Sequence, residues 1–147
     1  MLNELEVLTG VWSGTTDIRP SPLYPDGATF AASYTAQLDL AGRVLLGREV
    51  RRQGGRIVYQ GLTVLGWDAA RGQFTLHLFD TLQRQVLEPA FGEWRENALT
   101  LSQSTREGQL RFSYVVEDEK HCALRVSTRR AEEWAVVLDS RWERHGQ

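Results

Sequence analysis

Apolar and polar side chains alternate along most of this chain, and this period of two is the feature that most constrains its fold. In ATFAASYTAQL, residues 28–38, apolar residues such as Phe30 and Tyr34 occupy alternate positions, with threonine, serine and glutamine between them. Successive side chains of a β-strand point to opposite faces of a sheet. The stretch is therefore predicted to be a strand with one buried face.

The same alternation continues to the end of the chain, interrupted by turn signals such as LAGR, RQGGR and WDAARGQ. Short alternating segments between such turns predict an antiparallel sheet, and their spacing gives about ten strands. A meander sheet of this size can close on itself, which removes its exposed edges. We therefore expect an all-β chain in which residues 1–147 form a single closed antiparallel barrel domain.

Three segments depart from the strand pattern. Residues 2–9 are predicted to form a short helix, because three leucines repeat there at a spacing of three before Gly10. A strand predicted over residues 84–91 is interrupted by Pro89, which indicates an edge, a bulge or a gap in strand pairing. Residues 19–27, RPSPLYPDG, hold three of the four prolines and predict a long loop over one end of the sheet.

Composition excludes several classes of function. The chain has 17 Lys and Arg against 19 Asp and Glu, a net charge of −2, so it lacks the basic surface expected of a nucleic-acid or anionic-membrane binder. Cys122 is its one cysteine, which rules out an intramolecular disulfide and suggests a reducing, cytoplasmic location. Neither a leader segment nor an apolar run of membrane-spanning length is evident. A small-molecule or protein partner is expected.

A closed barrel of more than about eight strands leaves room for a ligand among its interior side chains. Aromatic residues on the predicted inward face offer a flat apolar body, and tyrosines add a hydroxyl that can orient a bound molecule. Ordinary core packing is the alternative role for each of them. The residues predicted to contact a ligand on these grounds are Tyr34, Tyr59, Phe112, Tyr114 and Trp134.

Arg48 is the most informative charged residue, because it shares the predicted inward face of its strand with valines and a leucine. A buried charge is seldom left without a partner. We expect Arg48 either to meet a carboxylate, Glu88 or Asp80, or to receive an acidic group of a ligand. Alternatively the strand faces the other way, and Glu49 points inward. Arg48 and Glu88 complete the set of predicted ligand-binding residues.

Gly10, Trp12 and Gly14 alternate at the start of the first strand, so two missing side chains flank a very large one. This motif resembles the first-strand signature of the calycin barrels, which include lipocalins, fatty-acid-binding proteins and nitrobindin-like proteins. The order of LAGRVLLGRE, YQGLTVLGWDAARGQF and LFD is similar to a bacterial lipocalin-like family of unknown function. The resemblance implies a barrel and leaves the ligand open. It also implies that Arg141 or Arg144 of the last strand covers Trp12 at a closed base.

The function we expect is that of a binding protein that holds a hydrophobic or amphipathic molecule in the barrel. One alternative is an enzyme on the same scaffold, with the candidate tyrosines, Arg48 and Glu88 as its acid–base groups. Another is a filled barrel that acts as an interaction module or homodimer, through an outer patch of Val58, Phe79 and Val137.

Haem binding, which the nitrobindin resemblance implies as a further alternative, would need a histidine inside the barrel. The predicted strand faces place none of His77, His121 and His145 there. Metal-binding motifs and the GxSxG nucleophile motif are absent from the sequence. We therefore assign no catalytic residue, no metal ligand and no cofactor.

Overall fold

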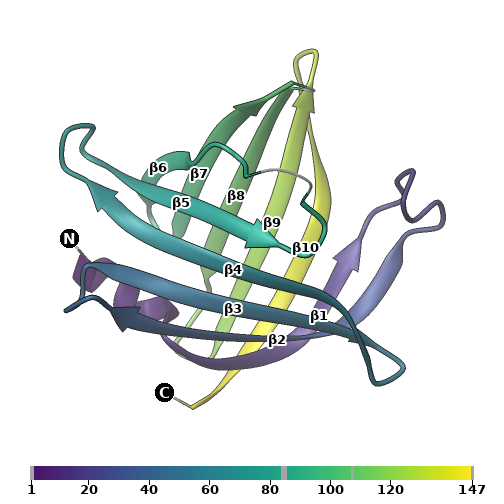
Figure 1. Cartoon of the computed structure of the whole chain (residues 1–147), viewed down its shortest axis with the longest axis horizontal. Helices are drawn as coiled ribbons and strands as arrows, with labels where there is room; N and C mark the ends of the chain where they lie inside the picture. Colours follow the sequence, from purple (N-terminus) through teal and green to yellow (C-terminus); the bar gives the residue numbers. More distant parts are fainter. Residues whose placement is uncertain (1, 84–85, 107, 147) are drawn as a thin grey trace.

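Antiparallel strands follow one another around a closed barrel, in which β1 pairs with β10 (Figure 1). The computed structural model describes residues 2–83, 86–106 and 108–146, and these contain the ten strands that the turn spacing predicts. The expected all-β meander barrel is confirmed. The strands are β1 (Gly10–Ile18), β2 (Ala28–Asp39), β3 (Val44–Gln53), β4 (Arg56–Asp68), β5 (Gln73–Asp80), β6 (Ala90–Arg95), β7 (Ala98–Thr105), β8 (Gly108–Val116), β9 (His121–Arg130) and β10 (Glu133–Gly146).

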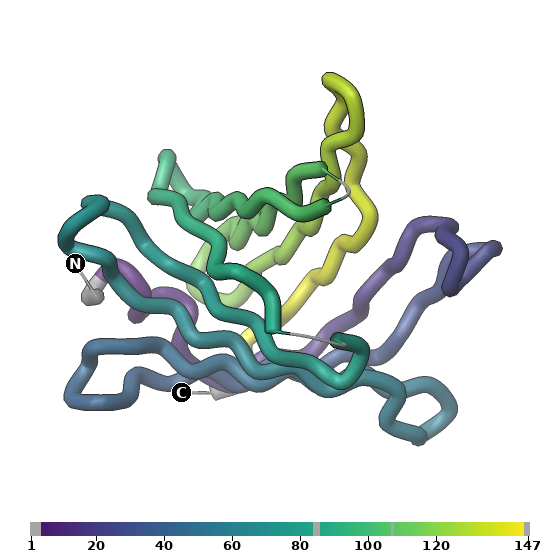
Figure 2. The backbone as a smooth tube through the Cα atoms, turned by 45° about the horizontal axis from the view of Figure 1, so that its top comes forward, coloured from purple at the N-terminus to yellow at the C-terminus, as the bar shows by residue number. Residues whose placement is uncertain are grey.

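The predicted N-terminal helix is a 3₁₀ helix, η1 (Leu2–Leu8), at the end of the barrel where β10 finishes (Figure 2). A leucine spacing of three matches the three residues per turn of this helix type. Leu5 and Leu8 of this helix are buried in the core of the barrel. We call this end the base, and the opposite end, where β1 connects to β2 and β3 to β4, the mouth. Among the described residues, no helix is long and apolar enough to cross a membrane.

The two glycines around Trp12 are required for different reasons. Gly10 has a φ of 127°, a conformation that residues with a side chain rarely adopt. At Gly14 the backbone of β10 approaches so closely that an added Cβ would lie 1.8 Å from the carbonyl oxygen of Arg141. The motif therefore fixes how β1 starts and how the barrel closes against β10.

Strand pairing is interrupted between β5 and β6, near Pro89 as the sequence indicated. Only Phe74–Leu76 pair with Ala90–Gly92 in the described part of the chain. The strand predicted over residues 84–91 is wrong over residues 86–89, which are not strand, and correct at residues 90 and 91, which belong to β6. Residues 84 and 85 lie outside the described residues. The wall of the barrel on the mouth side of this pairing therefore includes a loop.

The predicted inward face of β3 is wrong. Arg48 is exposed, whereas Leu45, Glu49 and Arg51 are buried. Register gives the reason, since Glu49 lies beside Tyr34 of β2 and shares its inward direction. Apolar residues occur on both faces of β3, so alternation within the strand favoured the face with more of them. The alternative, with Glu49 inside, is correct.

A β-bulge in β10 overturns the prediction for Trp134. The register shifts between Val136 and Leu138, so residues before and after it do not share one face. Trp134 packs against the Arg111 guanidinium at 4.0 Å, and Val137 lines the barrel cavity. Val137 therefore does not belong to the predicted outer patch. The period-two pattern assumes regular alternation, so it could not predict a bulge, which adds one residue to the strand.

Candidate ligand-binding site

A cavity of about 390 Å³ lies inside the barrel, toward the mouth. It is lined by β2–β5 on one side and by β8–β10 on the other. The loop over residues 19–27 contributes Leu23 and Tyr24 to its lining, and Tyr24 packs edge-to-face on Phe30 with ring centroids 5.6 Å apart. The predicted position of this loop over one end of the sheet is confirmed.

One side of the cavity is apolar. Strands β8, β9 and β10 direct aliphatic and aromatic side chains into it, in the alternation that the sequence predicts for β8 and β9. Removing such an apolar surface from water is favourable, whatever the detailed shape of the molecule that covers it. We call this set the apolar wall: Leu110, Phe112, Leu124, Val126 and Leu138.

The opposite side carries a group of hydrogen-bonded and charged side chains, which we call the polar wall: Glu49, Arg51, Tyr59 and Asp80. Arg51 Nε donates to Glu49 Oε2 at 2.7 Å, and both side chains are buried. The Arg51 guanidinium also lies 3.9 Å from the centre of the Tyr59 ring. Cross-strand pairing of Arg51 with Tyr59 places the cation directly beside the ring.

Asp80, at the end of β5, anchors this wall to the loop that follows. Its Oδ2 accepts a hydrogen bond from the Tyr59 hydroxyl at 2.9 Å. Its Oδ1 accepts from the backbone N–H groups of Leu82 at 3.0 Å and Gln83 at 2.9 Å. Burial raises the pKa of Tyr59 well above its usual range, and the negative charges of Glu49 and Asp80 raise it further. The phenol therefore stays protonated and serves as a hydrogen-bond donor.

Tyr34 forms part of the cavity floor between the two walls. Its ring stacks on Trp142 with centroids 4.5 Å apart and an interplanar angle of 6°. A side chain at Gly47 would collide with its hydroxyl, because an added Cβ would lie 2.3 Å from Tyr34 Oη and 2.6 Å from Thr63 Oγ1. Burial raises the pKa of Tyr34. The glycine thus makes room for two hydroxyl groups beside each other.

The sequence-predicted residues separate into two groups. Tyr34, Tyr59, Phe112 and Tyr114 line the cavity. Three others do not: Arg48 is exposed on the outer face of β3, Trp134 lies before the bulge of β10, and Glu88 is exposed in the segment before β6. Glu88 was predicted as an interior partner for Arg48, and it cannot serve because neither side chain points into the barrel.

Sequence reasoning missed Arg51 and Trp142 as cavity residues, and named Glu49 and Asp80 only as alternatives or partners. The signal for Glu49 and Arg51 was present in the pairing register, since Glu49 lies beside Tyr34 and Arg51 beside Tyr59. Tyr34 and Tyr59 were already predicted to point inward. Aligning the strands against each other would therefore have reversed the facing of β3.

At the base, an arginine covers the first-strand tryptophan as the resemblance implies. The guanidinium of Arg144 lies 4.5 Å from the centre of the Trp12 ring and donates a hydrogen bond to the Val7 carbonyl. Trp12 Nε1 donates to the Leu8 carbonyl at 3.1 Å. Helix η1, Trp12 and Arg144 therefore close this end of the barrel together.

Comparison with known proteins supports the fold alone. The structure is similar to the crystal structure of Rv2717c from M. tuberculosis, with a TM-score of 0.73 and 16% sequence identity over 98% of this chain and 96% of that chain. No family model matches the chain, and a search of curated proteins finds no match. The shared architecture extends over nearly the whole of both chains.

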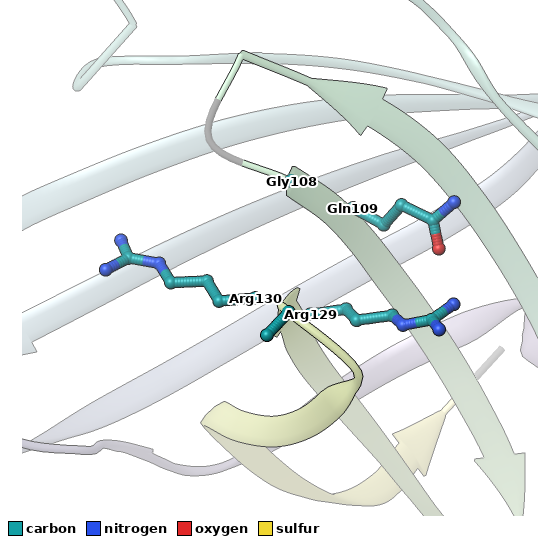
Figure 3. A pocket seen from close by; sticks show the side chains of 5 residues that line it. Gly108, Gln109, Arg129 and Arg130 are labelled. Atoms are coloured by element: carbon teal, nitrogen blue, oxygen red, sulfur yellow. The ribbon is translucent and has the colours of Figure 1, made fainter.

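A second hollow lies on the surface between the start of β8 and the turn after β9, with a volume of about 670 Å³. Figure 3 shows the Arg129 and Arg130 side chains extending away from each other in this region. Two guanidinium groups that diverge do not converge on one anion. The hollow therefore lacks the arrangement of donors that would fix a ligand.

The histidines lie away from the barrel cavity, as predicted from the strand faces. His77 of β5 alternates with the inward residues Leu76 and Leu78, and His121 and His145 are exposed. His121 Nδ1 lies 2.9 Å from Asp118 Oδ1 in the turn after β8. Among the described residues, no three His, Cys, Asp or Glu side chains gather where they could hold a metal ion.

Proposed function

We propose that this protein binds a small hydrophobic or amphipathic molecule inside the barrel. The observation that carries the proposal is the cavity of about 390 Å³ with an apolar wall facing a polar one. Ligand sites in proteins are typically concave, mostly apolar and supplied with a few polar groups that fix orientation. Here the apolar wall supplies affinity, and the polar wall determines which end of the ligand lies against β3–β5.

Affinity comes from apolar surface that both partners remove from water. Each Å² buried contributes roughly 25 cal/mol before the costs of ordering the ligand are subtracted. Aliphatic side chains of β8–β10 provide that surface, and their barrel scaffold keeps them in place without the ligand. A molecule with an apolar body and one polar end therefore fits this site better than a wholly polar one.

The lipocalin-like assignment belongs to the same proposal. Its support is the base, where Arg144 covers Trp12 in the way the resemblance to lipocalins implies. A closed base and a lined cavity toward the mouth are the arrangement that a calycin-type carrier needs. A cytoplasmic location, based on the single cysteine, stays a prediction.

The first test measures binding of the uncharged dye Nile red, whose fluorescence increases in apolar surroundings. The second incubates the protein with extracted lipids and identifies retained molecules by native mass spectrometry. We expect saturable dye binding and retention of at least one small molecule. Val126→Trp should reduce both, because the larger side chain fills the cavity from the apolar wall. Arg125→Trp, one residue away and facing outward, is the matched control.

Circular dichroism of both tryptophan variants distinguishes a filled cavity from an unfolded barrel. Should Val126→Trp unfold, Leu110→Phe provides a smaller change in the same wall. Wild-type protein that retains no dye and no lipid would overturn the proposal. Dye binding that survives in every cavity-filling variant would also contradict it, because the dye would then lie elsewhere.

A further inference from the structure

The charges of the polar wall determine which head group the cavity can receive. Glu49 and Asp80 bring two carboxylates, whereas Arg51 brings one guanidinium. The Arg51–Glu49 contact at 2.7 Å commits the positive charge to a carboxylate of the protein itself. Arg19 also borders the cavity, but it is exposed at the mouth, where water screens its charge. Glu49 and Arg51 are buried and neutralise each other, and the half-buried Asp80 therefore gives the wall as a whole an excess of negative charge.

Asp80 is held so that it cannot turn away from this wall. Its two oxygens accept hydrogen bonds from Tyr59 and from two backbone N–H groups of the loop after β5. The Tyr59 hydroxyl therefore donates its hydrogen bond to Asp80 and does not offer it to a ligand. Coulomb repulsion from Glu49 and Asp80 contributes to the raised pKa of Tyr59, as expected where a new negative charge would be unfavourable.

Among the four residues of the polar wall, the groups left for a ligand lie next to each other on β3. Within the described residues, the hydrogen bond between Arg51 Nε and Glu49 Oε2 is the single one that either side chain makes. Glu49 Oε1 remains as an acceptor, and the terminal amino groups of Arg51 remain as donors. A head group that both donates and accepts hydrogen bonds can satisfy the two side chains together without adding charge.

Resting on the proposed function, we infer that the cavity takes uncharged amphiphiles whose head group both donates and accepts hydrogen bonds, such as a long-chain alcohol or primary amide. It discriminates against the corresponding carboxylates. A ligand carboxylate would compete with Glu49 for Arg51 and would lie near two like charges. Like-charge contacts in a desolvated site are strongly unfavourable, so we expect carboxylates to bind at least about tenfold more weakly.

The experiment compares ligands that share a tail and differ in the head group. Nile red is bound to the wild-type protein at neutral pH and displaced by 1-decanol, decanamide or decanoate. The alcohol and the amide should displace the dye at concentrations at least about tenfold lower than decanoate does. Equal or stronger displacement by decanoate overturns the inference and leaves the proposed function intact. If neither dye nor amphiphile binds, the proposed function fails, and the inference fails with it.

A charge variant tests the cause of the preference. Glu49→Gln removes one carboxylate and frees Arg51, so displacement by decanoate should improve by about tenfold relative to displacement by decanol. Glu88→Gln removes an exposed carboxylate outside this cavity and is the matched control. An unchanged ratio of decanoate to decanol in folded Glu49→Gln contradicts the role of Glu49. If that variant is unfolded, the wild-type ligand series still decides the inference.

Discussion

The two ends of the barrel both place an arginine over an aromatic ring, with opposite results. At the base, the Arg144 guanidinium lies 4.5 Å from the centre of the Trp12 ring, and near the mouth that of Arg51 lies 3.9 Å from Tyr59. Contact between a guanidinium and an aromatic face is favourable at either end. What differs is the remaining environment of each arginine.

At the base, Arg144 donates to a backbone carbonyl of η1, and the helix covers the ring with Leu5 and Leu8. Near the mouth, Arg51 is paired with Glu49, and its surroundings include an open cavity. One contact therefore completes a closed core, whereas the other leaves polar atoms next to unfilled space. We therefore expect the base to determine stability and the mouth to determine the proposed binding.

The largest effect is expected from Trp12→Ala. Trp12 is 1% exposed, and its removal leaves a cavity at the base, which should lower the free energy of unfolding by about 3–5 kcal/mol. Trp134→Ala on the outer face loses mainly its contact with Arg111, at a cost of about 0.5–2 kcal/mol. Urea denaturation of both variants measures the difference. Equal losses would show that the base does not hold the barrel together.

A second effect separates the inward charges of β3 from an outward one. Glu49→Gln leaves Arg51 buried without its partner, which should cost about 3 kcal/mol. Combining Glu49→Gln with Arg51→Met should restore most of that stability, because replacing a buried ion pair by less polar side chains is often neutral. Arg48→Met, outward on the same strand, should change stability by less than about 0.5 kcal/mol. Chemical denaturation with each variant provides the measurement.

The binding readout makes this second test sharper. Glu49→Gln and the double variant should alter the preference among amphiphiles, whereas Trp12→Ala and Arg48→Met should leave it unchanged. If Trp12→Ala alters ligand preference as strongly as Glu49→Gln in folded protein, the separation between a structural base and a binding mouth is wrong.

Closure of the barrel depends on Gly14, and the effect of changing it is expected to be intermediate. Gly14→Ala places a Cβ against the β10 backbone, 1.8 Å from the Arg141 carbonyl oxygen, and should cost about 1–3 kcal/mol. Gly66→Ala is a suitable control, because its Cβ would meet nothing nearer than Thr75 Oγ1 at 3.4 Å. Thermal unfolding compares them. A neutral Gly14→Ala would mean that β1 and β10 can separate without loss.

The smallest effect concerns pH and the turn after β8 at the base. The hydrogen bond with Asp118 raises the pKa of His121, so this contact stabilises the fold below the ordinary histidine pKa of about 6.5. Its contribution disappears as pH rises through the higher pKa of the folded protein. NMR titration should give a higher pKa for His121 in the wild type than in Asp118→Asn. Identical values would show that the contact is not formed in solution.

The period-two pattern by itself determined the barrel and part of the cavity. Clear alternation predicted the inward direction of Tyr34, Phe112 and Tyr114, because each lies in a strand in which most apolar residues occupy one face. The spacing of three in the N-terminal leucines predicted the short helix, and the resemblance carried by the GxWxG motif implied the closed base. These features are local, so one strand or one turn of helix contains all the information that they need.

Tertiary structure alone decided the polar wall. In β3 both faces contain apolar residues, and only pairing with β2 and β4 places Glu49 and Arg51 inside, where they neutralise each other. In β10 a bulge reverses the facing of Trp134 relative to Trp142. A buried charge is tolerated when its partner comes with it, and a bulge adds one residue without any sequence signal. Both depend on neighbouring strands, which alternation within a single strand cannot reveal.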